Sequence, residues 1–165
     1  MARYDARTDR LMASAIRIID TSVLCNILHV LIKNQQSARA ERELREALRQ
    51  KDVLLLPVAV IYETGNHIAQ NGDGRVRRKI ARAFVDLVQK AFSGEVPFTP
   101  TPLQNPDEML EWIAVFPDRA GEGVGFGDLS IIRIFEHQCD LNHGRRVLIR
   151  SYDKHLQSYD RAARL

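Results

Sequence analysis

The chain has 165 residues, of which 45% are hydrophobic and 27% are charged. This length suits one compact domain with a sizeable core and is short for two, so we expect a single domain over residues 1–165, with residues 1–15 as an N-terminal extension. The 24 lysines and arginines against 21 aspartates and glutamates give a net charge of only +3, which does not by itself identify a nucleic-acid-binding protein.

The start of the chain is charged throughout and lacks the apolar run of a signal peptide. No later stretch is long enough to span a bilayer, so we expect a cytoplasmic protein with no membrane partner. The two cysteines, Cys25 and Cys139, have no zinc-type spacing and lie within apolar stretches. They are interpreted as buried thiols, which suits a reducing compartment.

A buried strand is predicted at residues 16–19, where the apolar run ends in Asp20. Apolar side chains then recur at helical spacing as far as Leu31, so this strand leads directly into a helix. Residues 37–51 are rich in helix-forming and charged residues, which predicts an exposed helix.

The same order of strand and helix then repeats. Residues 53–56 form a second apolar run that is stopped by Pro57, and residues 58–70 return to a helical pattern that includes Glu63. After a turn with the sequence NGDG, residues 75–92 carry apolar side chains at the spacing of a long amphipathic helix.

The segment from residue 94 to residue 127 is the least regular part of the chain. We expect a short strand at residues 96–99, a proline-rich turn, a helix at residues 107–115 and a flexible glycine-rich loop with the sequence GEGVGFG. Trp112 in this helix is interpreted as a core residue rather than as a platform for base stacking, because stacking surfaces need exposed aromatic rings beside basic residues.

The last part of the chain again alternates helix and strand. Asp128 is expected to open a helix, residues 147–149 to form another apolar strand that leads to Asp153, and residues 154–165 to form a short terminal helix. Apolar strands that alternate with helices predict an α/β fold, a three-layer α/β/α sandwich with a central, mostly parallel sheet. In such folds the functional crevice lies at the carboxyl ends of the strands.

Four acidic residues are candidates for that crevice: Asp20, Glu63, Asp128 and Asp153. Asp20 ends the first strand and Asp153 follows the last, so both project from the carboxyl edge if the two strands are neighbours. Carboxylates brought together repel one another unless a divalent cation stabilises their ionised form. Oxygen ligands select Mg²⁺ or Mn²⁺, and an ion held in this way can activate a water and neutralise charge on a phosphodiester oxygen.

Each of these acids also has an ordinary structural interpretation. Asp20 and Asp128 can cap the helices that follow them, and Asp153 can form an Asx turn or cap the terminal helix. Glu63 lies on a polar helix face that can simply meet water. His67 lies one turn beyond Glu63, but a surface or capping role is favoured for all five histidines.

Four segments, IIDTSVLCNIL, VAVIYETGNHI, FGDLSIIRIFE and LIRSYDKHL, resemble the successive acidic motifs of PIN-domain ribonucleases, including the VapC-like toxins of toxin–antitoxin pairs. The resemblance covers most of the chain in the right order and implies a PIN-like fold and metal-dependent endonucleolytic cleavage of RNA. It implies Mg²⁺ or Mn²⁺ as cofactor, a homodimer and, for a toxin, an antitoxin protein as partner. The residues that it assigns are the catalytic and metal-binding acids Asp20, Glu63, Asp128 and Asp153, with Ser22 and Ser151 as supporting hydroxyl groups.

Basic residues that can contact RNA phosphates cluster in the predicted helix after the NGDG turn. They are Arg75, Arg77, Arg78, Lys79 and Arg82. A solvated helix face is the ordinary alternative for this cluster.

Three other functions were weighed against a nuclease. A phosphatase that uses Asp20 as nucleophile is disfavoured because Ser22 stands where such enzymes have a second aspartate. A Rossmann or P-loop domain is disfavoured because no glycine-rich loop follows the first strand. A catalytically silent PIN-like module that binds RNA or protein is expected to lack one or more of the acids, and here all four positions are filled.

Overall fold

The structure is a computed structural model in which residues 14–164 are described. Nearly all of the N-terminal extension expected at residues 1–15 lies outside the described residues. The elements, in chain order, are β1 (Ile16–Ile19), α2 (Thr21–Ile27), α3 (Ser37–Arg49), β2 (Val53–Leu56), α4 (Val58–Gln70), α5 (Gly74–Ser93), β3 (Phe98–Pro100), α6 (Pro106–Gly121), α7 (Phe126–Leu141), β4 (Val147–Arg150), α8 (Lys154–Gln157) and β5 (Asp160–Arg161).

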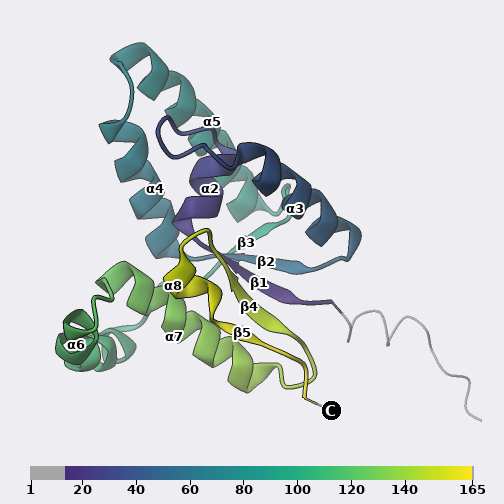
Figure 1. Cartoon of the computed structure of the whole chain (residues 1–165), viewed down its shortest axis with the longest axis vertical. Helices are drawn as coiled ribbons and strands as arrows, with labels where there is room; N and C mark the ends of the chain where they lie inside the picture. Colours follow the sequence, from purple (N-terminus) through teal and green to yellow (C-terminus); the bar gives the residue numbers. More distant parts are fainter. Residues whose placement is uncertain (1–13, 165) are drawn as a thin grey trace, which may run out of the picture.

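The described strands form one sheet in the order β3-β2-β1-β4-β5. The pairs β3–β2, β2–β1 and β1–β4 are parallel, and β5 pairs antiparallel with β4. Helices α2 to α5 lie on one side of the sheet, and α6 and α7 lie on the other (Figure 1). The predicted α/β fold with a mostly parallel central sheet between two helical layers is therefore confirmed.

The strands form because their side chains are apolar on both faces and both faces are covered. Ile18, Leu54, Leu56 and Val147 are almost completely buried in the core of the protein. Burial of each such side chain contributes about 2 kcal/mol, so the three central strands, β1, β2 and β4, anchor the fold. The condition for Asp20 and Asp153 to lie at one edge, that the first strand and the last clear strand are neighbours, is fulfilled because β1 lies directly beside β4.

A buried ion pair fastens the amino ends of β1 and β2. Arg17 is the one charged residue in β1, and its Nε lies 2.6 Å from Oδ2 of Asp52, whose side chain is only 1% exposed. The other oxygen of Asp52 accepts a hydrogen bond of 2.7 Å from the backbone N–H of Ala15. Both oxygens of this carboxylate therefore have a partner, as a buried charge requires.

The segment from residue 94 to residue 127 differs from its prediction. The strand lies at 98–100 rather than 96–99, and α6 extends well beyond the expected 107–115. A capping box between Asn105 and Glu108 starts α6, and the helix continues past Pro117 although a proline removes one backbone hydrogen bond. Of the glycine-rich sequence expected to be a flexible loop, Gly121 belongs to α6 and Phe126 and Gly127 belong to α7, which leaves residues 122–125 as the loop.

The predicted terminal helix at 154–165 is also wrong. Only four residues form α8, after which the chain turns back and adds β5 to the outer edge of β4. Backbone N–H of Ile149 donates to the carbonyl of Tyr159 at 2.9 Å, and the guanidinium of Arg146 pairs with Asp160. This return covers an edge of the sheet that would otherwise expose unpaired backbone groups.

Side-chain burial settles the remaining expectations about the core. Cys25 is buried, whereas Cys139 is only partly buried, so the prediction of two buried thiols is half right. Trp112 is 9% exposed, which confirms its interpretation as a core residue. No helix within residues 14–164 combines the length and the apolar character needed to cross a membrane.

Candidate functional site

The structure brings the four predicted acids to one pocket at the carboxyl edge of the sheet. The pocket has a volume of about 390 Å³, and its walls include Asp20, Glu63, Asp128 and Asp153. Asp20 follows β1 and Asp153 follows β4 on the adjacent strand, whereas α4 supplies Glu63 and the first turn of α7 supplies Asp128. We call this site the acid pocket.

Asp20 is the most firmly held of the four acids. It is 5% exposed, and its Oδ2 accepts hydrogen bonds from Ser22 Oγ at 2.6 Å, from Ser151 Oγ at 2.8 Å and from the backbone N–H of Ser22 at 3.2 Å. Its Oδ1 accepts no hydrogen bond from the described residues, so that oxygen remains available to a ligand.

The two serine hydroxyls also connect the residues that follow β1 to the residues that follow β4. Ser22 Oγ accepts a hydrogen bond of 2.9 Å from the backbone N–H of Tyr152, and Ser151 Oγ accepts one of 2.9 Å from the backbone N–H of Asp153. Each hydroxyl donates to Asp20 and accepts from the backbone, so both of its roles are used. The two residues named as supporting hydroxyls therefore do contact the acid that they were expected to support.

Glu63 has a partner that the sequence analysis missed. Thr21 Oγ1 donates to Glu63 Oε2 at 2.8 Å, which links the start of α2 to the middle of α4. His67 Nε2 lies 3.8 Å from Glu63 Oε1 and also lines the acid pocket. The signal for Thr21 was its place directly after Asp20, but nothing local in the sequence indicates a contact across 42 residues.

Asp128 is the least supported of the four acids. Its side chain accepts no hydrogen bond from the described residues. Burial, followed by the negative charges of Asp20, Glu63 and Asp153, raises the pKa of Asp128 to about 6. The raised pKa follows from the burial of Asp128 and from the closeness of the three other carboxylates in the acid pocket.

The capping interpretations are resolved by the helix starts. Asp20 and Asp153 do cap α2 and α8, because Asp20 accepts from the N–H of Ser22 and Asp153 accepts from the N–H of His155. Capping and a place in the acid pocket are therefore compatible for these two residues. The expectation that Asp128 opens its helix is wrong, because α7 begins at Phe126 with Gly125 as its N-cap.

The chemistry of the pocket fits a hard divalent cation that keeps part of its water shell. The described residues contain no three His, Cys, Asp or Glu side chains close enough together to hold one ion directly. Mg²⁺ commonly binds through one or two carboxylates and retains several waters, whereas a structural zinc ion needs a closed set of four protein ligands. Asp20 and Asp128 have carboxylate oxygens that accept no hydrogen bond from the described residues, and these oxygens are available as ligands to such an ion.

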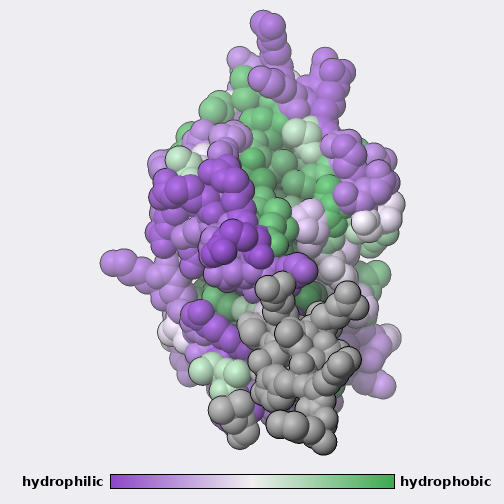
Figure 2. Space-filling model, turned by 90° about the vertical axis from the view of Figure 1, so that its right-hand side faces the viewer, coloured by the Kyte–Doolittle hydropathy of each residue, from purple (hydrophilic) through white to green (hydrophobic). Residues whose placement is uncertain are grey.

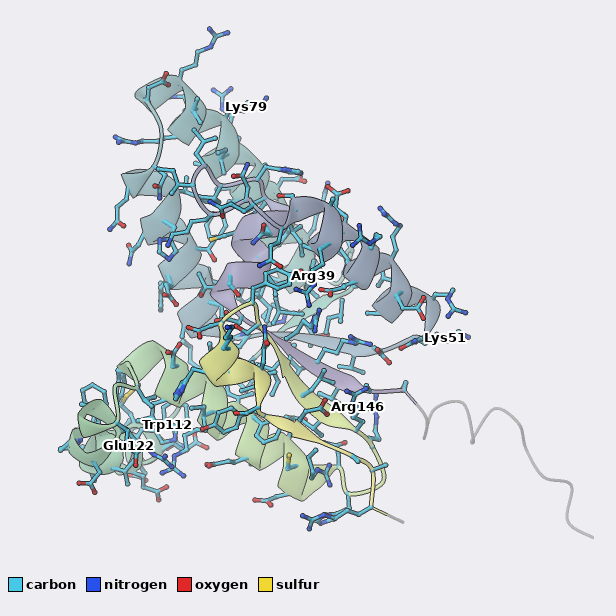
Figure 3. The ribbon with its side chains drawn as sticks, in the orientation of Figure 1. Arg39, Lys51, Lys79, Trp112, Glu122 and Arg146 are labelled. Carbon is cyan, nitrogen blue, oxygen red and sulfur yellow. The ribbon has the colours of Figure 1, made fainter. Side chains whose placement is uncertain are left out.

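The predicted RNA-binding cations lie away from the acid pocket. Arg75, Arg77, Arg78, Lys79 and Arg82 are all exposed on α5. None of them has a carboxylate partner among the described residues. Figure 3 shows Lys79 near the tip of the α4–α5 hairpin, at the far end of the molecule from Trp112 and Glu122. The structure therefore separates the cations from the acids rather than mixing them in one site.

A second cluster that the sequence analysis missed borders the acid pocket. Glu43 on α3 pairs with Arg150, accepts from Arg39 Nε at 2.8 Å and accepts from the Tyr152 hydroxyl at 2.9 Å. The guanidinium of Arg39 lies 5.0 Å from the centre of the Tyr152 ring. Because Tyr152 lines the acid pocket, this cluster fixes one wall of the site.

No family model, curated protein or solved structure matches the chain. What the site can do is therefore argued from its own residues and from the motifs in the sequence.

Proposed function

We propose that this protein is a Mg²⁺- or Mn²⁺-dependent endoribonuclease with a PIN-like fold, which hydrolyses phosphodiester bonds of RNA at the acid pocket. The observation that carries the proposal is that Asp20, Glu63, Asp128 and Asp153, which come from separate parts of the chain, line one pocket at the carboxyl edge of a parallel sheet. Four carboxylates in one pocket repel one another, which a bound divalent cation would relieve.

The residues divide the work of such a site. A divalent cation bound in the acid pocket through one or two of its carboxylates, with waters as its other ligands, would activate a water and neutralise charge on a phosphodiester oxygen. Ser22 and Ser151 hold Asp20 in a fixed orientation through hydrogen bonds of 2.6 and 2.8 Å. Thr21 holds Glu63 in the same way at 2.8 Å. Supporting hydrogen bonds of this kind fix the orientation of the ligand side chains, and small displacements of those side chains lower activity.

The proposal is tested by incubating purified protein with an end-labelled mixed RNA pool in Mn²⁺ or Mg²⁺. We expect fragments from the wild type that are absent in EDTA and absent with Asp20→Asn. Asp118→Asn, which changes an exposed aspartate on α6, is the matched control and should cleave like the wild type. Cleavage that persists in EDTA or in Asp20→Asn would contradict a metal-dependent reaction at this pocket.

The second candidate function is a catalytically silent PIN-like module that binds RNA or a protein. It is favoured by the absence, among the described residues, of three acidic, histidine or cysteine side chains gathered tightly enough to hold an ion directly. Intact RNA under every metal condition, with a protein that remains folded and binds RNA, would select this candidate.

The partners implied by the resemblance belong to the same proposal. We propose a homodimer, and an antitoxin protein if the chain is the toxin of a toxin–antitoxin pair. An apolar stripe between hydrophilic surfaces, on the face seen in Figure 2, supports a protein–protein contact. Exposed apolar side chains on the helices of the molecule, such as Leu48, Val85 and Phe92, are the kind of residue that such contacts bury.

A further inference from the structure

The connection between α2 and α3, residues 28–36, has an unusual backbone. His29 has a φ of 55° and Ile32 a φ of 66°, both in the left-handed region. For a β-branched residue this is a strained conformation, and strain of this kind persists only where the surrounding structure imposes it, often at binding sites. The side chain of Ile32 is also 69% exposed, so the strain presents an apolar group to solvent.

Asn26, which lines the acid pocket, ties the far end of this α2–α3 loop to α2. Its side-chain oxygen accepts from the N–H of Gln36 at 2.8 Å, and its carbonyl accepts from Ser37 Oγ at 2.8 Å. Its Nδ2 donates to the carbonyl of Ser22 at 2.8 Å, and Ser22 lies two residues after Asp20. The loop is therefore a built part of the site and not a passive connection.

One cation and two amides of the α2–α3 loop line the acid pocket: Lys33, Gln35 and Gln36. Lys33 is exposed, and its ammonium group makes no ion pair or hydrogen bond with the described residues, although four carboxylates line the same pocket. Because the ammonium group of this lysine is unpaired, it is available to an anionic ligand. A phosphate that approaches the pocket would be such a ligand.

The α2–α3 loop also reaches the cationic helix. Leu31 lies against Gly72 in the turn between α4 and α5, where a methyl group added to Gly72 would lie 3.1 Å from Leu31 Cδ1. The unpaired cations of α5 begin three residues later at Arg75. Figure 1 shows the same arrangement, with the loop passing beside the α4–α5 hairpin. The α2–α3 loop therefore lies between the acid pocket, which Lys33 lines, and the turn that leads to Arg75.

We propose that the α2–α3 loop holds the substrate strand, with Lys33 on a phosphate next to the acid pocket and Ile32 against an unpaired base. This inference rests on the proposed function and adds the segment of the chain that would hold the RNA strand beside the acid pocket. An exposed aliphatic side chain can contact the face of a base only where that base is unstacked, whereas bases in a duplex present only their edges. From the loop, the strand continues toward the α5 cations, whose phosphate contacts carry no sequence choice.

The test is binding of a fluorescent, unstructured RNA to the full chain in Ca²⁺, measured by anisotropy over a series of salt concentrations. Lys33→Gln is expected to weaken binding about fivefold to tenfold and to reduce the slope of log affinity against log salt by about 0.7, the value for one phosphate contact on a single strand. Lys51→Gln is the matched control, because Lys51 is exposed and lies away from the α4–α5 hairpin in Figure 3. It should change neither quantity.

Ile32→Asn separates binding from stability. Asparagine tolerates a positive φ, so this variant should melt no lower than the wild type, yet bind the single-stranded RNA about threefold more weakly with an unchanged salt slope. The same RNA annealed into a duplex should bind the wild type and both loop variants alike. Equal affinity of the wild type and Lys33→Gln for the single strand, or no binding by the wild type, would overturn the inference.

Failure of the inference and failure of the proposed function give different results. If the wild type cleaves RNA while Lys33→Gln binds and cleaves as well as the wild type, the α2–α3 loop is not the strand contact and the nuclease stands. If Lys33→Gln loses affinity as expected but no metal supports cleavage by the wild type, the loop binds RNA in a protein without nuclease activity.

Discussion

At the scale of single residues, two carboxylates of the acid pocket differ in the hydrogen bonds that they accept. Asp20 accepts three hydrogen bonds on one oxygen, two of them from serine hydroxyls. Asp128 accepts none from the described residues, and burial and like charges raise its pKa to about 6. The first residue is stabilised by the fold, whereas the second lowers the stability of the metal-free protein at neutral pH.

Ser151→Ala should destabilise the protein and lower its activity together. Ser151 is 1% exposed. The substitution removes the hydrogen bond from its hydroxyl to the Asp20 carboxylate and leaves the backbone N–H of Asp153 without its acceptor. We expect a loss of about 2 kcal/mol in the free energy of unfolding, measured by urea denaturation. Ser158→Ala, at an exposed serine, should cost less than about 0.5 kcal/mol. Equal losses in the two variants would argue against a supporting role for Ser151.

Asp128→Asn should stabilise the metal-free protein at pH 7. The ordinary pKa of this carboxyl is 3.8, and the folded pocket raises its pKa to about 6, first through burial and then through the charges of Asp20, Glu63 and Asp153. Between these two values the folded chain binds more protons than the unfolded chain, so the free energy of unfolding falls as the pH rises. Removing the charge should therefore add about 1 kcal/mol at pH 7, after allowance for solvent screening of a half-buried group.

The measurement for this prediction is thermal denaturation in EDTA at pH 5 and pH 7. The advantage of Asp128→Asn over the wild type should be larger at pH 7, where the wild-type carboxylate is ionised. Asp118→Asn should track the wild type at both pH values, because Asp118 is exposed. A variant less stable than the wild type at pH 7 would mean that Asp128 makes a favourable contact not seen in the structure.

At the scale of elements, the walls of the site depend on how α3 packs against the end of β4. Glu43 connects these two elements through Arg150 and Tyr152, which lie 107 and 109 residues away in the sequence. Burial alone would raise the pKa of Glu43, but hydrogen bonds from Arg150, Arg39 and Tyr152 outweigh it and hold this pKa below its ordinary value of 4.5. The cluster therefore stabilises the fold only while Glu43 is ionised.

Glu43→Gln should lower the free energy of unfolding at pH 7 by about 2 kcal/mol, because it replaces charge-assisted hydrogen bonds with weaker ones. The wild type should lose this advantage as the pH falls below 4.5 toward the lowered pKa of the folded state, since protonation then removes the same charge. Urea denaturation at pH 7 and pH 4 measures both effects. Glu111→Gln, at an exposed glutamate on α6, is the control and should leave the free energy of unfolding unchanged. A difference between wild type and Glu43→Gln that grows as the pH falls would contradict this account of the cluster.

The sequence predicts elements well where local signals decide them. Apolar runs that end in Asp20 and in Pro57 mark β1 and β2 at their observed bounds, and α4 has its predicted bounds as well. The errors lie where tertiary contacts override local signals. Pro117 does not end α6, and the two residues of β5, Asp160 and Arg161, form a strand only because the edge of β4 is free to pair.

At the scale of the whole molecule, the topology assembles the acid pocket. The order β3-β2-β1-β4-β5 places β1 beside β4, so Asp20 and Asp153 follow neighbouring strands at one edge of the sheet. The sequence indicates Asp20 and Asp153 because each follows a strand at this edge, whereas Glu63 and Asp128 lie within helices and were indicated by the motifs that contain them. It does not indicate Thr21 as the partner of Glu63, since that contact depends on how α2 and α4 approach each other.

The layout of charge follows from the same topology. The acids gather at the carboxyl edge of the sheet, and the unpaired cations of α5 gather on a hairpin that extends away from it (Figure 1). The α2–α3 loop, with Lys33 at the acid pocket and Leu31 against Gly72, connects the two regions. A polyanion bound along this surface would place one of its phosphates at the acid pocket.

Whether the four carboxylates form one divalent-cation site is tested most directly by calorimetric titration of Mn²⁺ into the protein at pH 7.5. The wild type and Asp118→Asn should bind Mn²⁺ with the same affinity, and Asp128→Asn should bind it at least about tenfold more weakly, because it has lost one of the four acids that line the pocket. Equal Mn²⁺ affinity of Asp128→Asn and the wild type, or no Mn²⁺ binding by a folded wild type, would contradict a shared metal site at the acid pocket.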